Sequence, residues 1–311
     1  MHEPWQAFLE IGTIQAMAYP EVRLGDGPIL ETARRIAQDP FWTAIEVGEV
    51  LDDTVRGQLA ELLRVGGMTV IYCAALPILI HKLPIASPDE QARQGAVATL
   101  RRHIDHAYEL GARLWMACSG RDPGPVTRAA ANDAFVRSLG ELCAYARQRA
   151  TDYVLGITFE NFDYNVEKKF LVGPTTQAAE VVRAVRAAGH PNMGLTVDLS
   201  HLPLLGETPA HALSAAGEYL LHAHIGNCIL RNKQHPFFGD NHPRFGIPDG
   251  ENGVPEVAEF IRQLRAQGFF SRAVPTGRPV LTIEVKPMPG EDGDLVLANA
   301  QRVWQQAWAV A

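Results

Sequence analysis

Four short segments of this sequence carry a side chain that can bind a metal ion. They read ITFENFD, VDLSH, HAHIGN and TIEVKP, and they contain Glu160, Asp198, His224 and Glu284. Three carboxylates cannot lie together in a buried site without a compensating cation, because desolvating their charges costs too much free energy. A divalent ion would compensate them. Three oxygen ligands and one imidazole suit Mn²⁺ first, with Mg²⁺, Co²⁺ or Zn²⁺ as alternatives. We therefore expect one bound divalent metal ion.

The residues around these four alternate between apolar and polar, as they do along a strand with two different faces. Leu221, Ala223 and Ile225, for example, alternate with His222 and His224. The apolar face suits a helix layer, so the polar face is expected to point into a barrel. His222 would then lie below His224, as a substrate contact, a support for the ligand or a buried core histidine. Any one such residue is more often a solvated strand end, but the joint pattern on four strands indicates a metal site.

The elements that must position these side chains alternate along the chain. Short apolar runs predict eight strands, and amphipathic stretches predict eight helices. The predicted strands span Phe8–Met17, Thr43–Val47, Met68–Ala74, Arg113–Cys118, Val154–Glu160, Met193–Asp198, Leu220–Ile225 and Val280–Lys286. The predicted helices span Pro28–Gln38, Thr54–Val65, Pro88–Leu110, Ala129–Arg149, Thr175–Ala188, Pro209–Ala216, Val254–Gln267 and Asp294–Ala309. This order predicts an α/β fold, a single (β/α)8 TIM barrel. The rival, an open doubly wound sheet, usually has a Gly-rich turn after its first strand, where this chain has only Gly12.

One long irregular segment, residues 227–253, follows the seventh predicted strand within an expected single domain over residues 1–311. Loops of this length in a compact domain usually serve as lids or binding loops, and loops after barrel strands form the catalytic rim. We expect Arg231, His242 and Arg244 to contact the substrate. The alternative is a loop that docks a subunit, since its PFF and RF segments are apolar enough to meet a partner.

With these motifs, to which IPDGENG adds one more, the chain resembles the xylose isomerase-like barrel superfamily. Its members include ketose 3-epimerases, hydroxypyruvate isomerase, inosose dehydratase and endonuclease IV, and the resemblance runs over all eight strand–helix units. It implies that Glu160, Asp198, His224 and Glu284 are the metal ligands. It also implies that His201, three residues after Asp198, binds substrate. The two glutamates, Glu160 and Glu284, are implied to be catalytic acid–base groups as well.

The chain also departs from the epimerases. They have a substrate-binding Arg six residues after the ligand His, where this chain has Leu230, with Arg231 one step on. The long loop, together with FDYNVEKKFLVG after the fifth predicted strand, looks more like α-subunits of C-glycoside deglycosidases. Those are implied to eliminate an aglycone from 3-keto-glycosides alongside a small β-subunit.

Several other residues have two interpretations. Lys286, two residues beyond Glu284, could bind a substrate oxyanion or neutralise the carboxylates. Glu46 is expected to point inward from the second strand, although an ordinary ion pair explains it equally well. His103 and His106 lie in a helix rich in Arg and Glu, and we expect them to face solvent.

The expected chemistry is proton transfer on a small sugar or keto-glycoside. One Glu would remove the proton next to the carbonyl, and the metal would stabilise the enediolate. Return of the proton by the other Glu gives isomerisation or epimerisation, whereas loss of a β substituent makes the enzyme a lyase. A DNA-repair endonuclease would need extra His ligands and a basic rim. A non-catalytic sugar-binding barrel would not need Glu on both sides of a metal.

The composition fits a soluble protein of the cytoplasm. With 28 Lys and Arg against 35 Asp and Glu, the net charge is −7, so we expect no nucleic acid partner. The four cysteines include no Cys-x-x-Cys pair, which suits reduced thiols. We expect no signal peptide and no membrane partner, because the apolar runs are short. A homo-oligomer and a small partner subunit both stay open.

Overall fold

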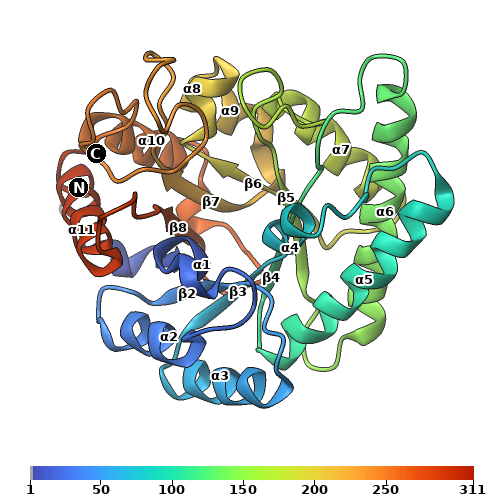
Figure 1. Ribbon diagram of the computed structural model, residues 1–311, viewed down its shortest axis with the longest axis horizontal. Helices are drawn as coiled ribbons and strands as arrows, with labels where there is room; N and C mark the ends of the chain where they lie inside the picture. Colours follow the sequence, from blue (N-terminus) through green and yellow to red (C-terminus); the bar gives the residue numbers. More distant parts are fainter. Residues whose placement is uncertain (1–2) are drawn as a thin grey trace.

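The computed structural model, which describes residues 3–311, is a closed barrel of eight parallel strands. Each strand pairs with the next along the chain, and β8 pairs with β1 to close the barrel. The strands are β1 (Glu10–Ile14), β2 (Ala44–Val47), β3 (Thr69–Cys73), β4 (Leu114–Cys118), β5 (Gly156–Glu160), β6 (Met193–Asp198), β7 (Leu220–Gly226) and β8 (Val280–Glu284). Figure 1 shows these strands in the centre, with helices around them. The predicted single (β/α)8 barrel is confirmed.

Eight long helices form the outer ring of the barrel. They are α2 (Ile29–Gln38), α3 (Asp53–Val65), α5 (Glu90–Glu109), α6 (Arg128–Arg149), α7 (Thr175–Ala187), α9 (Pro209–Ala216), α10 (Val254–Ala266) and α11 (Gly293–Val310). Each buries an apolar stripe; α2, for example, buries Ile29, Ala33 and Ile36 at helical spacing. No helix within residues 3–311 is both long and apolar enough to cross a membrane.

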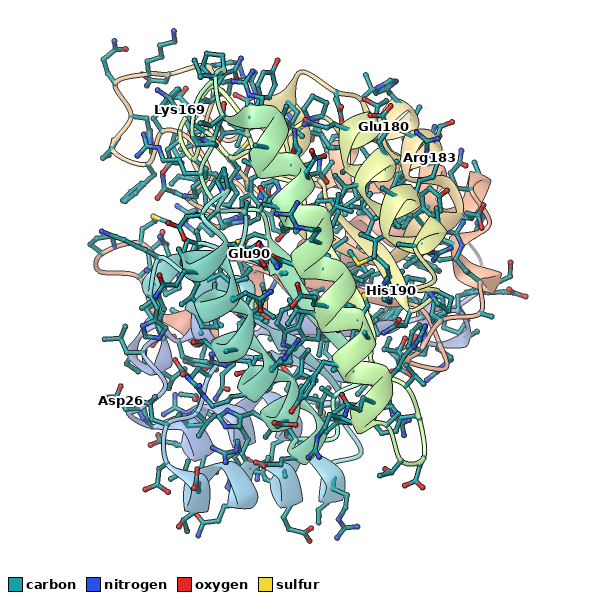
Figure 2. The ribbon with its side chains drawn as sticks, turned by 90° about the vertical axis from the view of Figure 1, so that its right-hand side faces the viewer. Asp26, Glu90, Lys169, Glu180, Arg183 and His190 are labelled. Carbon is teal, nitrogen blue, oxygen red and sulfur yellow. The ribbon has the colours of Figure 1, made fainter. Side chains whose placement is uncertain are left out.

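Side-chain caps decide where several of these helices begin. Asp52 accepts hydrogen bonds from two backbone N–H groups at the start of α3, and Asp292 accepts one at the start of α11. Helix α5 begins at Glu90 and not at the predicted Pro88, because Asp89 is its cap. In Figure 2, α5 and α6 lie side by side on the outer side of the barrel. The buried Arg93 of α5 pairs with Glu141 of α6 at 2.7 Å.

Three short helices lie at the carboxyl ends of strands, and the predicted strand pattern missed them. They are α1 (Gln15–Ala18), α4 (Ala75–Ile80) and α8 (His201–Leu205). Strand β1 is therefore shorter than the predicted Phe8–Met17, because the chain turns at the rim. The Gln15 side chain fixes this turn by donating to the Ile29 carbonyl oxygen and to Thr32 Oγ1. In Figure 1, α1 and α4 lie close to the mouth of the barrel.

The barrel interior is filled in layers of increasing polarity. At the amino ends of the strands, an apolar cluster closes the barrel; it comprises Ala44, Ile71, Leu114, Leu221 and Val280. Above it, Thr196 donates to Thr158 at 2.9 Å, and His222 Nε2 lies 3.0 Å from Thr282 Oγ1. The third layer, at the carboxyl ends, contains the acidic residues of the candidate site.

Leu221 corrects one part of the predicted alternation. The alternation predicts that Leu221 lies on the outer face with Ala223 and Ile225, but its side chain lies in the apolar cluster inside the barrel. The cause is a bulge: Leu195 pairs with Leu220 and Thr196 pairs with His222, so Leu221 has no partner on β6. A Cβ on Gly194 would lie 2.3 Å from the Leu221 side chain, so this glycine makes room for it.

Candidate metal centre and active site

The four predicted ligands come together at the carboxyl ends of β5 to β8. Glu160, Asp198 and Glu284 end their strands, and His224 lies two residues before the end of β7. One ligand atom from each residue lies within 4.8 Å of the others, and all four side chains are buried. His224 Nδ1 is 3.0 Å from Glu284 Oε2 and 3.4 Å from Glu160 Oε1. The four therefore form one compact group, as a shared ligand set requires.

The turn between β6 and α8 fixes the Asp198 carboxylate. The backbone N–H of Ser200 donates to Asp198 Oδ1 at 2.7 Å, and the Ser200 hydroxyl donates to Oδ2 at 2.5 Å. The carboxylate is thus oriented before any ligand binds.

Glu46, on β2, holds His224 from the side opposite the other carboxylates. Glu46 Oε1 is 2.9 Å from His224 Nε2 and 3.2 Å from His222 Nε2. Burial acts to raise the pKa of Glu46, but the two imidazoles outweigh it and hold that pKa at about 2. A carboxylate that binds Nε2 leaves Nδ1 facing the ligand group, a common way to orient a metal-binding imidazole. Glu46 therefore points inward, as expected, and supports His224.

A second group of side chains lies beside the first. Asp198, His201 and His242 also bring ligand atoms within 4.8 Å of one another. Asp240 completes this group: its Oδ1 is 2.9 Å from His242 Nε2 and 3.3 Å from His201 Nε2. His201 Nδ1 lies 2.9 Å from the Asn161 carbonyl oxygen, so Nε2 is the atom that faces the group.

The carboxylates change the proton affinity of these histidines. Burial alone would lower the pKa of both. Asp240 and Glu160 instead raise the pKa of His201 well above its ordinary value, and Glu284 and Asp240 raise that of His242 to about 9. Both imidazoles are therefore suited to donate hydrogen bonds at neutral pH.

The loop of residues 227–253 is anchored to the barrel and carries Asp240 and His242 to the site. Asn227 Oδ1 accepts from the backbone N–H of Asn252 at 2.9 Å, and Asn252 Nδ2 donates to the Gly226 carbonyl oxygen at 2.9 Å. Gly226 also leaves space for His242, because a Cβ there would lie 2.8 Å from His242 Nδ1.

The buried polar atoms of the site fit a divalent metal ion. Glu160 Oε1, an oxygen of the four-ligand group, is buried without a hydrogen-bond partner among the described residues. Buried charged oxygens without partners carry a large desolvation cost, which a cation removes. The donor set of the first group, three carboxylates and one imidazole, suits such an ion.

A cavity of about 230 Å³ opens above the two groups. Glu160, Asp240, His242 and Glu284 form its polar side. Apolar side chains form much of the rest; they include Ile14, Met17, Leu76, Leu79, Met116 and Phe162. Helices α1 and α4 supply several of them, so these short helices shape the cavity.

Three of the predicted substrate-binding residues lie at this cavity or beside it. His242 and Lys286 line it. His201 is buried between Asp198 and Asp240, and its ring lies against Phe162, tilted by 37°, with 4.4 Å between ring centroids.

The other three predicted substrate-binding residues lie elsewhere. His222 is buried one layer below and does not line the cavity. The Arg231 side chain is 70% exposed and pairs with Glu251 at 3.0 Å. Arg244 pairs with Glu291 at 2.7 Å. Arg231 and Arg244 do not reach the cavity, because ion pairs with Glu251 and Glu291 hold their side chains elsewhere.

Other residues reach the cavity without having been singled out. Asp240, Asn241, Arg23, Lys168 and Phe162 all line it. Of these five residues, only Asp240 has a position in the sequence that could indicate a place at the site, because it lies two residues before His242. Arg23 and Lys168 lie in irregular segments, where periodicity says nothing about direction.

His103 corrects the expectation that it faces solvent. Its side chain is buried, and His103 Nδ1 lies 2.7 Å from the Tyr72 hydroxyl. His106 is half-buried. Helix α5 presents this face to the barrel, because Val97, Leu100 and Ile104 lie along the same buried stripe.

Comparison with known proteins gives a family match and several structural matches. The family model described as "Xylose isomerase-like TIM barrel" matches residues 39–295. A D-psicose 3-epimerase from Clostridium cellulolyticum, solved with D-tagatose, is 18% identical, covers 97% of each chain and has a TM-score of 0.67. A D-tagatose 3-epimerase-like protein is 19% identical, covers 97% of this chain and 98% of its own, and has a TM-score of 0.71.

A further match is a 3-keto-D-glucoside 4-epimerase from E. coli. It is 15% identical, covers 96% of this chain and 99% of its own, and has a TM-score of 0.65. At these identities the structural matches establish the fold alone. Comparison with the curated proteins gives no match.

Proposed function

Because this chain belongs to the xylose isomerase-like TIM barrel family, we propose that it is a metal-dependent enzyme that moves a proton on a small keto-sugar. The observation that carries this proposal is the placement of Glu160 and Glu284. The two carboxylates come from strands on either side of the other ligand strands, and both line one cavity. The matched structures, whose names describe sugar epimerases, support the same class of reaction.

The proposed mechanism assigns a task to each group of residues. The metal, Mn²⁺ in our first assignment, polarises the substrate carbonyl when bound. One of Glu160 and Glu284 takes the proton from the carbon next to that carbonyl, and the other returns a proton to carbon. His201 and His242 donate hydrogen bonds to the substrate oxygen on which negative charge develops.

Exchange of carbon-bound hydrogen with solvent tests this function directly. We expect the metal-loaded protein to introduce deuterium next to the carbonyl of one or more keto-sugars in deuterated water, as followed by NMR. The panel comprises neutral ketoses, ketose phosphates, acidic keto-sugars and 3-keto-glucosides. If no member of the panel exchanges with metal bound, the proposed function is wrong.

A second candidate function, β-elimination on a 3-keto-glycoside, is favoured by the apolar side chains of the cavity. Leu76, Leu79 and Phe162 could pack on a nonpolar aglycone, whereas a simple ketose offers them only a small apolar surface. The same first proton transfer would then be followed by loss of the aglycone. Release of free aglycone from a 3-keto-glycoside distinguishes this lyase reaction from epimerisation.

Glu46 is proposed to position His224 without touching substrate. Changing Glu46→Gln should weaken metal binding about 10- to 100-fold, the range measured for carboxylates that support a ligand histidine. Titration of the metal-free variant with Mn²⁺ measures this effect separately from activity. Glu49→Gln is the matched control, because Glu49 pairs with His81 at 2.9 Å outside the ligand group. Equal metal affinity in the Glu46 variant and the wild type would contradict the assigned role.

A further inference from the structure

Three cations line the same cavity as the carboxylates. Arg23 follows α1, Lys168 lies in the loop after β5, and Lys286 lies two residues beyond Glu284. At the rise of an extended chain, two residues place Lys286 about 6–7 Å farther out than Glu284. Lys286 thus lies nearer the cavity mouth than the metal-ligand group.

Two of these cations have no acidic partner within residues 3–311. Neither the Arg23 side chain nor Lys286 Nζ forms a hydrogen bond or an ion pair there, although the Lys286 backbone N–H donates to the His242 carbonyl oxygen at 2.8 Å. Lys168 is only partly compensated: its Nζ donates to the Asp240 carbonyl oxygen at 2.9 Å and lies 3.2 Å from Glu167 Oε1.

The three cations differ in burial. Lys168 and Lys286 are half-buried, whereas Arg23 is exposed at the rim of the cavity. An unpaired cation in a half-buried position is unfavourable unless a ligand supplies the opposite charge.

The carboxylates deeper in the site do not supply the negative charge that these cations lack. Glu160, Asp198 and Glu284 belong to the group that fits a metal ion, and Asp240 faces His201 and His242. Their charges are therefore matched within the inner layer. The outer layer is left positive, in a protein whose net charge is −7.

We propose that the substrate carries an anionic group, a phosphate or a carboxylate, which Arg23, Lys168 and Lys286 bind while the substrate carbonyl lies at the metal ligands. This inference rests on the proposed function and narrows its substrate class to acidic or phosphorylated keto-sugars. The apolar side of the cavity would then contact the carbon chain between the two polar ends.

Binding of compounds without a carbonyl tests this inference separately from catalysis. We expect calorimetry on the metal-loaded protein to show that sorbitol 6-phosphate or gluconate binds about 100-fold or more tightly than sorbitol. Each hydrogen bond to a charged group is worth roughly 10- to 100-fold in affinity. Arg23→Gln and Lys286→Met should therefore each lower that preference about tenfold or more. The stronger of the two anionic ligands identifies phosphate or carboxylate as the group recognised.

Lys169→Met is the matched control. Lys169 is the exposed neighbour of Lys168 (Figure 2), and it does not line the cavity. We expect this variant to keep the full preference. Equal binding of the three compounds, or no binding of any, would overturn the inference. Hydrogen exchange on neutral keto-sugars together with equal binding would leave the proposed function standing. A strong anion preference without exchange on any keto-sugar would support the anion-binding site and contradict the proposed function.

Discussion

Changing Glu160→Gln or Glu284→Gln is expected to lower the rate of hydrogen exchange on the substrate by roughly 10²- to 10⁴-fold, the usual contribution of a general acid or base. Glutamine keeps the size of the side chain and one oxygen that can bind a metal, but it cannot accept the proton. Both glutamates are buried and both line the cavity, so water has little room to replace either carboxylate. Deuterium incorporation measured at saturating metal gives the rate.

Two checks make this result specific to proton transfer. Metal content is measured on the same samples, so that a lost ligand is not mistaken for a lost base. Glu61→Gln, in an exposed pair with Arg64, is the control and should retain full activity. Near-normal turnover in both active-site variants with metal bound would mean that another residue is the base.

Removing the side chain of a metal ligand should have the second large effect, a loss of bound metal. We expect the wild-type protein to bind about one divalent ion per chain, and Asp198→Ala or His224→Ala to lose it. These side chains offer ligand atoms to one compact group, and no other side chain of that group can replace them from its own strand. Elemental analysis after dialysis measures the metal content of each variant.

The control for ligand removal is His211→Ala, which changes an exposed histidine on α9. This variant should bind as much metal as the wild type. If Asp198→Ala and His224→Ala both retain the wild-type metal content, the ligand assignment is wrong. Loss of metal with loss of folded structure would be detected by circular dichroism, and Asp198→Asn would then provide a milder test.

The barrel and the inner layer of the site could be predicted from the sequence because both depend on short-range periodicity. Alternation within β5, β6 and β8 places Glu160, Asp198 and Glu284 on the inner face, and parallel strands bring their carboxyl ends together. The same rule failed at Leu221, where an added residue in β7 shifts the register. A bulge depends on the fit of two strands, here Leu221 over Gly194, and a single strand pattern does not contain that information.

The outer layer of the site could not be predicted, because irregular segments supply it. Arg231 and Arg244 lie in the expected loop, but ion pairs within the rim hold them away from the cavity. Lys168 reaches the cavity because Asp163 accepts hydrogen bonds from the backbone N–H groups of Val166, Glu167 and Lys168 and so folds the loop after β5. Such contacts between neighbouring side chains and backbone have no period that a sequence pattern could reveal.

The loop after β7 is divided in two by an antiparallel bridge between Ile229 and Gly239. Residues 230–238 form an outer arch, while Asp240 and His242 follow on the inner side of the bridge. A change in the length of the arch, for example at the exposed Lys233, can therefore be absorbed without displacing Asp240 and His242. The bridge thus makes the arch a separate module, whose length can be changed by engineering while the part of the loop that lines the cavity keeps its position.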